Sequence, residues 1–498
     1  MKPAVEYIGP SSSYASALLE VLASAPTRVV VVKRGVSITA GELLEKIGNA
    51  ADIIEPHLLN KPGLPPRIGL MFYDNLQSII HGIGCWLLGA EPHFLDHRLA
   101  HTDLPKMMVR DKIDLILTGR AHISPPIPGV IAVVDQVLSP EGAEGAKLRI
   151  RRARQAGLDP ETPSQVTSSS GVSGPPKLKS QTQKQLFLAI LTMVQFGRRG
   201  PWGTMLSATS VAFSAPRLLW WRNLLYGRLI ISHDLLTSTA ELDSALLDPL
   251  VEECSLAPVV IRQLLQHHNT VADRTAPRYP HLLKLLSVGG PASASEKLAA
   301  YHQLTPCYLM SYSSAETGII TLQGGSDLLS APGSCGRAIP RKEISIVDKD
   351  GMPLPCGQIG RVKVTHLLWQ DVAAVNWPGD LGWLDAEGFL YLTSRGEGII
   401  CRNGESFWAG TLEAHLLQDP NLLDAAVLVL HGGDADDRLV FGLRIRPEAD
   451  EQRVASQLIA RLPNHQRPET VVFATAEDIS TGGKLLRARL LEKAKDSL

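Results

Sequence analysis

A regular alternation of short apolar runs with helical segments constrains the fold of this chain more than any other feature. The run RIGLMFY at residues 67–73 has the length of a buried strand, and residues 76–88 repeat apolar side chains with helical spacing before Gly89. Two further strand-length runs, at residues 90–96 and 114–119, enclose a second helical segment. Parallel strands joined by crossover helices produce this order. The sequence therefore predicts an α/β domain whose mostly parallel sheet is covered by helices.

The last part of the chain follows a different pattern and predicts a second domain. From Glu343 strands alternate with turns such as Asp350-Gly351, still before the last hundred residues, which look separate. Three strand-like runs and a helical segment capped near Asp450 then follow, which is the pattern of a small α+β domain. We expect a large N-terminal domain over residues 1–394 and a small C-terminal domain over residues 395–498.

Composition and charge narrow the classes of function. The 498 residues carry 49 lysines and arginines against 50 aspartates and glutamates, a net charge of −1. Bulk nucleic-acid binding needs a basic surface, so we expect no nucleic-acid partner. The six cysteines are scattered, no His-Glu-x-x-His is present, and no apolar run has the length of a membrane span or the context of a secretory signal. We expect a protein of the reducing cytoplasm.

A small, hydroxyl-rich loop at residues 167–180, TSSSGVSGPPKLKS, is the strongest candidate for a binding site. Backbone N–H groups, hydroxyls and the Lys177 ammonium together can hold an anion such as phosphate. The spacing of Gly171 and Gly174 excludes both the GxxxxGK[ST] loop and the GxGxxG fingerprint. A flexible linker of Ser, Gly and Pro is the alternative. The polar stretch before the loop, residues 149–163, is expected to be a surface connector.

The segment SSGVSGPPK resembles the phosphate-binding signature of the adenylate-forming enzymes, which include acyl- and aryl-CoA synthetases, peptide-synthetase adenylation domains and luciferases. Val172 and Leu178 depart from a hydroxyl residue and a glycine of that signature. The resemblance implies that the loop holds the β- and γ-phosphates of ATP. The residues that would do so are Ser169, Ser170, Gly171, Ser173, Gly174 and Lys177.

The segment SYSSAETG, residues 311–318, is similar to the family's Tyr-Gly-x-Thr-Glu segment. The resemblance implies that the ring of Tyr312 lies against adenine and that Glu316 holds Mg²⁺, a hard cation that prefers carboxylate oxygen. Ala315 stands where the family usually has threonine. A core tyrosine is the alternative for Tyr312.

The segment GDLGWLDAEGFLYLTSR, residues 379–395, matches the family's Gly-Asp-Leu-Gly block. The resemblance implies that Asp380 accepts hydrogen bonds from the ribose hydroxyls and that Arg395 approaches ribose or phosphate at the junction of the two domains. A turn aspartate is the alternative for Asp380.

The segment ISTGGKLLRARL, residues 479–490, resembles the family's C-terminal Ser-Gly-Lys-x-Leu-Arg segment. Lys484 then stands where a lysine bridges the substrate carboxylate and the α-phosphate. A solvated surface lysine is the alternative.

The resemblance implies a large N-terminal AMP-binding domain of mixed and parallel sheets, followed by a small mobile C-terminal domain. That small domain would turn about a hinge at Glu397. Its rotation would remove Lys484 and admit a thiol, either of CoA or of the phosphopantetheine of a carrier protein. Asn403 replaces one of two usual glycines in the turn that lines the thiol's path.

The acid-binding pocket is expected around the segment AFSAPRLLWW. Family members that activate α-amino acids carry an aspartate after the phenylalanine, and this chain has Ser214, which disfavours an amino acid. Flat side chains there suit an aromatic or short hydrophobic acid, but burial of the tryptophans in the core is the alternative. Arg217 and Arg222 lie either at the surface or against a second polar group of the substrate. The expected pocket residues are Phe213, Ser214, Trp220, Trp221, Gly289 and Gly290.

The leading hypothesis is an AMP-forming ligase that uses ATP and Mg²⁺ to activate an aryl or short acyl acid and transfers it to a thiol. One alternative passes the adenylate to an amine or another nucleophile. Another is a nucleotide-binding protein that no longer catalyses, which the departures at Leu178, Ala315 and Asn403 would suit. No general base is required, because a carboxylic acid is already ionised at pH 7.

We predict that Lys484→Ala lowers the rate of adenylate formation at least about a hundredfold, because the charge that develops at the α-phosphate loses its cation. The same variant should form thioester from a supplied acyl-adenylate at the rate of the unmodified protein. ATP–pyrophosphate exchange measures the first step. A variant that adenylates normally would show that the C-terminal lysine is misassigned.

Overall fold

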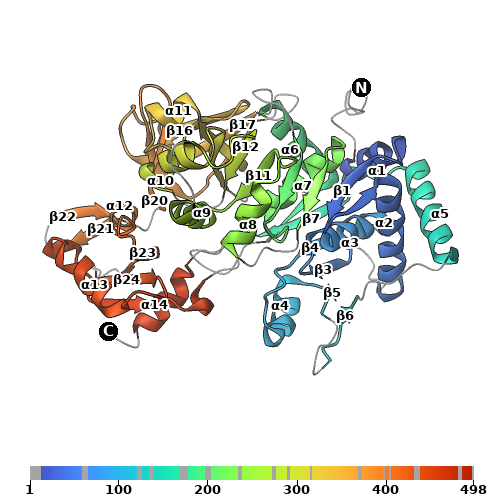
Figure 1. The fold of residues 1–498 in the computed structure, drawn as a ribbon, viewed down its shortest axis with the longest axis horizontal. Coiled ribbons are helices and arrows are strands. Elements are labelled where there is room, and N and C mark those ends of the chain that lie inside the picture. The colour runs from blue at the N-terminus through green and yellow to red at the C-terminus, as the bar shows by residue number, and fades with distance from the viewer. Residues whose placement is uncertain are drawn as a thin grey trace. The chain divides into compact units, whose positions relative to one another are not determined.

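The structure is a computed structural model that divides into two compact units, each built from several segments of the chain. The first unit comprises Met1–Ser169, Lys177–Leu256 and Arg278–Leu286, and the second comprises Ser170–Pro176, Ala257–Pro277 and Ser287–Leu498. Their elements are labelled in Figure 1. The structure describes residues 13–58, 65–120, 126–133, 140–168, 178–196, 203–233, 238–271, 276–288, 292–314, 317–367, 373–395, 399–402, 405–430, 438–479 and 485–495.

A four-stranded parallel sheet in the first unit confirms the pattern at the start of the sequence. Its strands, in the order β4-β3-β5-β6, are β4 (Glu91–Phe94), β3 (Arg67–Met71), β5 (Leu115–Thr118) and β6 (Val130–Ala132). Helix α3 (Asn75–Leu87) connects β3 to β4, and α4 (Leu104–Asp111) connects β4 to β5. Gly89 has a φ of +65°, a left-handed conformation that glycine adopts without strain and that turns the chain from α3 into β4.

A second sheet of the first unit has the order β12-β11-β9-β10-β1-β2. Strands β1, β10, β9 and β11 pair in parallel, whereas β1 and β2 form an antiparallel hairpin. The bounds are β1 (Val29–Lys33), β2 (Val36–Thr39), β9 (Met205–Ser207), β10 (Ile230–Ser232), β11 (Glu253–Leu256) and β12 (Lys284–Ser287), with β7 (Pro163–Ser168) and β8 (Leu178–Thr182) as a separate antiparallel pair. The remaining helices are α1 (Tyr14–Ser24), α2 (Ala40–Ile54), α5 (Pro140–Ala156), α6 (Gln183–Phe196), α7 (Ser214–Leu225) and α8 (Thr239–Leu246).

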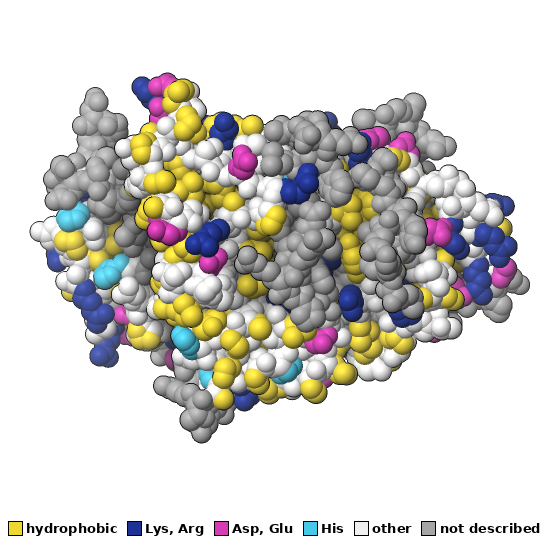
Figure 2. Space-filling view, turned by 90° about the horizontal axis from the view of Figure 1, so that it is seen from above, with side chains coloured by type: hydrophobic (Ala, Val, Ile, Leu, Met, Phe, Trp, Pro, Cys, Tyr) yellow, Lys and Arg dark blue, Asp and Glu magenta, His cyan; other side chains and the backbone are white. Residues whose placement is uncertain are grey.

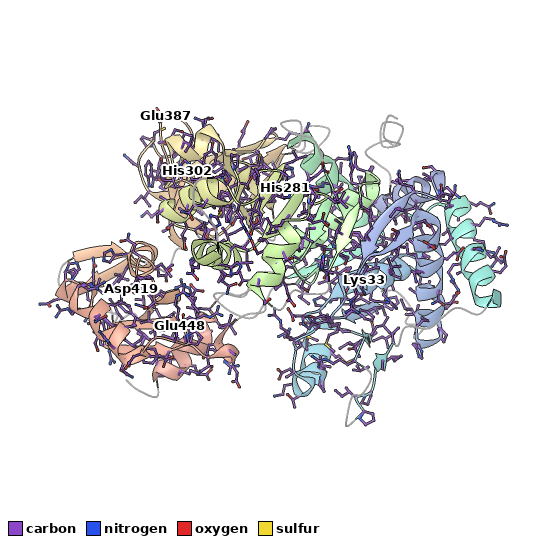
Figure 3. All side chains as sticks on the ribbon, viewed as in Figure 1. Lys33, His281, His302, Glu387, Asp419 and Glu448 are labelled. Carbon is purple, nitrogen blue, oxygen red and sulfur yellow. The ribbon has the colours of Figure 1, made fainter. Side chains whose placement is uncertain are left out.

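An ion pair connects the two sheets of the first unit. The ammonium of Lys33, at the end of β1, pairs with the carboxylate of Asp74 (Figure 3). Asp74 is also the N-cap of α3 and accepts a hydrogen bond from the N–H of Leu76 at 2.9 Å. The carboxylate therefore stabilises a helix start and binds a neighbouring strand at once.

Helix α5 shows that the expectation of a surface connector at residues 149–163 was wrong for residues 149–156, whereas residues 157–162 connect α5 to β7. The side chain of Arg149 donates to Asp52 at 2.7 Å and pairs with Glu55 at 2.6 Å, while Ile150 is buried. The many arginines of this stretch therefore lie on the polar side of an amphipathic helix. Composition alone did not reveal the helix, because charged residues outnumber its apolar ones.

The second unit begins with antiparallel sheets. Strands β13 (Tyr308–Ser314), β14 (Gly318–Gly324) and β15 (Arg337–Ala338) pair in that order. A further sheet has the order β16-β17-β19-β20, with β18 against β17. Its strands are β16 (Lys342–Val347), β17 (Gly360–Leu367), β18 (Ala373–Asn376), β19 (Asp380–Leu384) and β20 (Leu390–Arg395), and the helices of this region are α9 (Pro258–Val271), α10 (Ala294–Ala299) and α11 (Ser326–Ser330).

The residues after β20 have hydrophobic cores of their own. One core gathers around Phe441 and Leu412, and another packs Leu490 against Val440. The elements are β21 (Ile399–Arg402), β22 (Glu405–Trp408), α12 (Ala409–Leu416), β23 (Leu422–Leu430), β24 (Arg438–Ile445), α13 (Glu451–Ala460), β25 (Thr470–Phe473) and α14 (Arg487–Lys495). The domain boundary expected at residues 394–395 lies inside the second unit and stays a prediction.

Local signals in the second unit agree with the sequence at two places. Asp450 is the N-cap of α13, and Gly351 has a φ of +85° in the turn after Asp350. Among the helices that the structure describes, none is both long and apolar enough to cross a bilayer.

We predict that Gly48→Ala lowers the free energy of unfolding by about 1–3 kcal/mol, the usual range for overpacking. A Cβ at Gly48, in α2, would lie 2.6 Å from the carbonyl oxygen of Ala146 in α5. Gly145→Ala is the matched control, because its Cβ would meet only an Asp52 oxygen at 4.0 Å. The control should be neutral or slightly stabilising, since alanine favours helix. Equal denaturant midpoints for the two variants would contradict this packing.

Candidate active site

Many of the residues expected at the site lie outside the part of the chain that the structure describes, and their roles stay predictions. They are Ser169, Ser170, Gly171, Ser173, Gly174, Lys177, Gly289, Gly290, Glu316, Glu397 and Lys484. The described remainder falls into two groups, Tyr312, Asp380 and Arg395 in the second unit and Phe213, Ser214, Trp220 and Trp221 in the first.

The structure brings the side chains of Tyr312 and Asp380 together and places the backbone of Arg395 across the ladder from Asp380. The hydroxyl of Tyr312, on β13, donates a hydrogen bond to the carboxylate of Asp380, the first residue of β19. Asp380 pairs across the ladder with Arg395, the last residue of β20. Three residues separated by up to 83 positions in the sequence therefore meet at one place in the second unit.

Two glycines on either side of Asp380 set its position. Gly379 has a φ of +83°, which other residues rarely adopt. At Gly382 a Cβ would lie 2.4 Å from the carbonyl oxygen of Tyr391, beside a bulge between Leu381 and Gly382. The local backbone therefore explains why both positions are glycine. Gly379 has a left-handed dihedral angle, and at Gly382 two strands approach too closely for a side chain.

The connection between β13 and β14 is closed by side-chain hydrogen bonds. The Ser314 hydroxyl lies 2.6 Å from that of Thr317 and accepts the Thr317 N–H at 3.2 Å. Gly318, opposite Ser314 in the ladder, has a φ of +65°. Residues 315 and 316, the second of which is the expected metal ligand Glu316, lie between these described ends.

Lys342 is a residue of this region that sequence reasoning missed. It begins β16, and its ammonium donates to the backbone carbonyls of Thr317 and Ile319. Burial lowers its pKa to about 8, and burial together with the charges of Lys342 and Arg341 lowers the pKa of His366 to about 4. The only sequence signal was a lysine at the start of the apolar run EISIV, where solvent exposure is the usual expectation.

The two tryptophans expected in the acid pocket lie in the core of the first unit, which was the alternative. Both have an exposed fraction of 0%. The Trp220 indole N–H donates to Ser207 at 2.8 Å, and that of Trp221 donates to Gln165 at 3.2 Å. The Trp221 ring lies 4.9 Å from that of Trp86. Indole rings with satisfied N–H groups and close aromatic neighbours are core residues.

Phe213 and Ser214 occupy the start of α7. Phe213 is the half-buried N-cap residue and Ser214 is exposed. Among the described residues expected in the pocket, Phe213 and Ser214 therefore have surface that a ligand can contact, whereas Trp220 and Trp221 do not.

The two arginines of α7 are both buried. Arg222 pairs with Glu253, and burial lowers its pKa to about 10. Arg217 donates to Gln165 and to the Val211 carbonyl, both at 2.8 Å, and burial lowers its pKa to about 9. Its guanidinium lies 4.5 Å from the centre of the Phe94 ring. These contacts give both arginines roles in packing.

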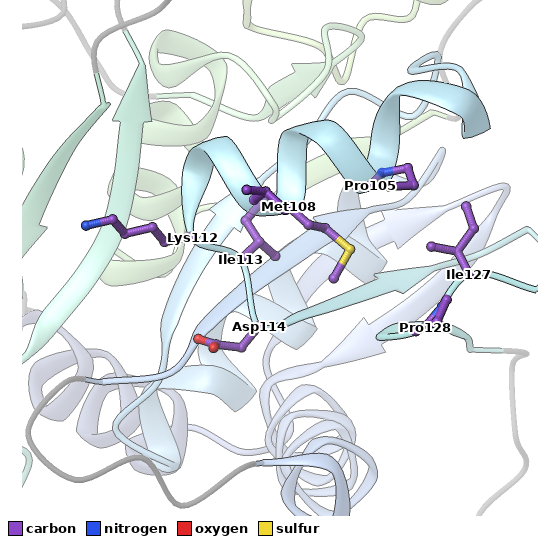
Figure 4. Close-up of a pocket in the computed structure, with 8 residues that line it drawn as sticks. Pro105, Met108, Lys112, Ile113, Asp114, Ile127 and Pro128 are labelled. Carbon is purple, nitrogen blue, oxygen red and sulfur yellow. The ribbon is translucent and has the colours of Figure 1, made fainter.

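An open groove of about 510 Å³ in the first unit contains none of the expected site residues (Figure 4). Its walls come from α4, from the segment that follows α4 and from the segment that precedes β6. They are formed by Pro105, Met108, Val109, Lys112, Ile113, Asp114, Ile127 and Pro128. The groove is mostly apolar and offers no cluster of groups for chemistry.

The described residues hold no cluster of three or more His, Cys, Asp or Glu side chains fit for a metal ion. On the face shown in Figure 2, Lys and Arg side chains are interspersed with Asp and Glu. The described residues of that face form no continuous basic surface.

Residues 18–366 match the model of the AMP-binding enzyme family, and the chain belongs to this family, within the adenylate-forming superfamily. Its fold agrees. The chain superposes on an anthranilate CoA ligase solved in complex with anthranoyl-AMP, with a TM-score of 0.76 over 100% of both chains and 15% sequence identity. The large N-terminal region of mixed and parallel sheets with a following C-terminal region is therefore the adenylate-forming fold.

Two relatives illustrate the range of sequence similarity. The chain is 29% identical over 249 residues to a 2-succinylbenzoate–CoA ligase of Geobacillus kaustophilus, a match that covers 46% of this chain and 50% of the relative. It is 24% identical over 538 residues to a 3-hydroxybenzoate–CoA ligase of Aromatoleum sp., covering 99% of this chain and 97% of the relative. Matches to the first relatives span about half of their length or less.

We predict that Trp220→Ala lowers the free energy of unfolding by about 3–5 kcal/mol, the cost of removing a buried indole. Trp377→Ala is the control, because that ring is 43% exposed and lies beside Arg361. The control should cost about 1 kcal/mol or less. Chemical denaturation measures both. If the Trp220→Ala protein were as stable as the Trp377→Ala protein, Trp220 would not be a core residue and would again be a candidate for the acid pocket.

Proposed function

We propose that this chain is an AMP-forming ligase that activates a carboxylic acid with ATP and transfers the acyl group to a thiol. The observation that carries the proposal is the meeting of Tyr312, Asp380 and Arg395 in a chain of the AMP-binding family. An aromatic ring, a carboxylate and a guanidinium are the groups that adenine, ribose hydroxyls and phosphate respectively require.

The described residues fit the nucleoside part of ATP. Tyr312 is half-buried beside an apolar cluster that includes Ile320, so its ring is held while part of it stays accessible. The Asp380 carboxylate accepts the Tyr312 hydroxyl, and a carboxylate is the acceptor that ribose hydroxyls require. The loop from Ser169 to Lys177 would bind the β- and γ-phosphates.

Both reactants are anionic, and the site must offset their repulsion. Lys484 would hold the acid carboxylate and the α-phosphate together so that attack is in line. Glu316 would hold Mg²⁺, which supplies positive charge to the phosphates. The acid reacts as its carboxylate, so no side chain has to remove a proton.

The proposed acid is an aryl or short hydrophobic acid. Ser214 offers no carboxylate for an ammonium group, and the relatives named for hydroxybenzoate and succinylbenzoate support an aromatic acid. Since Trp220 and Trp221 lie in the core, the proposed pocket residues are Phe213, Ser214, Gly289 and Gly290.

The proposed acceptor is the thiol of CoA or of a carrier protein, and the names of the relatives support CoA. Residues 395–498 would turn as a small domain about Glu397 between the two half-reactions. We propose a place in the cytoplasm, where ATP and CoA are both supplied.

We predict ATP–pyrophosphate exchange that depends on an added carboxylic acid. Benzoates and short acyl acids should support exchange, and α-amino acids should not. Addition of CoA to a responding acid should release AMP and form thioester. A protein that binds ATP but exchanges with no acid of a broad panel would overturn the ligase proposal, and transfer to an amine in place of a thiol would overturn the acceptor.

Asp380→Asn tests the nucleotide site within the same assay. The loss of one charge-assisted interaction should raise the KM for ATP about tenfold or more while the KM for the acid is kept. Asp348→Asn is the matched control, because Asp348 accepts the N–H of Met352 at 2.9 Å in an exposed turn of the same unit. Equal KM values for ATP in the two variants would show that Asp380 does not bind the nucleotide.

A further inference from the structure

Lys342 is a buried cation held by backbone carbonyls. Its exposed fraction is 6%, and its ammonium donates to the carbonyls of Thr317 and Ile319. Among the described residues no carboxylate forms an ion pair with it, and its ladder partner is His366, whose lowered pKa leaves it neutral at pH 7. Burying an ammonium is costly, so a lysine at this position has to be explained by what it binds.

The Ile319 carbonyl lies where the ladder between β13 and β14 is irregular, and the Thr317 carbonyl comes directly before β14. Tyr312 pairs with Thr321, but the next residue, Ser313, pairs with Ile319, so Ile320 is an extra residue of β14. A bulge of this kind disrupts the ladder, and buried carbonyls then need other donors. The Ile320 carbonyl accepts the N–H of Ile339 at 3.0 Å.

Lys342 supplies the donors on the other side of this bulge. Its ammonium binds one carbonyl next to the extra residue, that of Ile319, and one at the start of the strand, that of Thr317. Thr317 is the first described residue after Glu316, and Ile319 pairs with Ser313, the neighbour of Tyr312 on β13. The side chain of Lys342 thus connects β16 to the part of β14 that pairs next to Tyr312.

We propose that Lys342 is a positioning residue of the nucleotide site, which holds Thr317–Ile319 against the strand of Tyr312 through two backbone carbonyls. The proposal rests on the proposed function, because that function makes Tyr312 and Glu316 nucleotide ligands. Lys342 itself does not touch the nucleotide. Its effect on MgATP arises through the segment that it holds.

Lys297 provides a control of the same kind at another place in the second unit. Its exposed fraction is 3%, and burial lowers its pKa to about 8. Its ammonium donates to the Gln323 side chain at 2.7 Å and to the Ser334 carbonyl at 2.6 Å. Lys297 and Lys342 therefore resemble each other in burial and partners, and differ in that only Lys342 binds the start of β14.

The test compares Lys342→Met with Lys297→Met. Methionine keeps the length of the side chain and removes the donors, so both variants should lose stability. Only Lys342→Met should weaken MgATP binding, by about tenfold or more, because the loss of charge-assisted hydrogen bonds moves the segment. Calorimetric titration of ATP with saturating Mg²⁺ measures the affinity, and pyrophosphate exchange gives the Mg²⁺ concentration for half-maximal rate, which should rise as well.

A second pair of variants separates positioning from general loss of structure. Lys342→Arg keeps cationic donors and should retain MgATP affinity within about threefold, whereas Lys342→Gln should lose it like Lys342→Met. If Lys342→Met does not fold, Lys342→Gln takes its place in the comparison. Equal MgATP affinity in Lys342→Met and Lys297→Met, or a Lys342→Met protein that binds MgATP like the unmodified protein, would overturn the proposal.

The unmodified protein distinguishes this failure from failure of the proposed function. Absence of MgATP binding by the unmodified protein would overturn both proposals. Tight binding of MgATP by the unmodified protein with no change in Lys342→Met would overturn only the role of Lys342. Binding without exchange would contradict the ligase while the affinity comparison still decides the positioning role.

Discussion

A buried backbone carbonyl that has lost its ladder partner must find another donor, and this requirement shapes the second unit around β14. The bulge opposite Tyr312 leaves carbonyls that bind the N–H of Ile339 and the ammonium of Lys342. With that strand held, Tyr312 on β13 meets Asp380 at the start of β19, and Asp380 meets Arg395 across the ladder. The need of these backbone carbonyls for hydrogen-bond donors thus helps to hold the strands on which three expected nucleotide residues converge.

Periodicity predicted those parts of the fold in which burial follows spacing. The runs that became β3 and β5 are mostly apolar because both faces of a parallel sheet are covered, so they could be found without the structure. Helix α5 could not be found in this way, because the partners of Arg149 are carboxylates of distant segments. Its amphipathic character appears only once α2 is in place.

Short motifs predicted the convergence of Tyr312 and Asp380, because a site needs particular groups at particular spacings. They did not predict Lys342, since a lysine is usually exposed. Its burial here depends on β14, a strand that starts at Gly318, 24 residues earlier in the sequence. The tryptophans of α7 were equally suited to a pocket or a core in the sequence. Only the neighbours Gln165, Ser207 and Trp86 decided for the core.

The pairing of distant strands within the first unit has a consequence for biosynthesis. Strand β1 pairs with β10, and Val31 lies opposite Ile230. Ile230 leaves the ribosome about 200 residues later, so β1 cannot form this pairing until then. At about 5–20 residues per second this delay lasts roughly 10–40 s. Throughout that time the edge of β1 that pairs with β10 is unpaired. For most of it α1 also lacks α7, in which the Trp221 carbonyl accepts the Tyr14 hydroxyl. The nascent N-terminal segment is therefore a natural client for chaperones that bind exposed apolar chain.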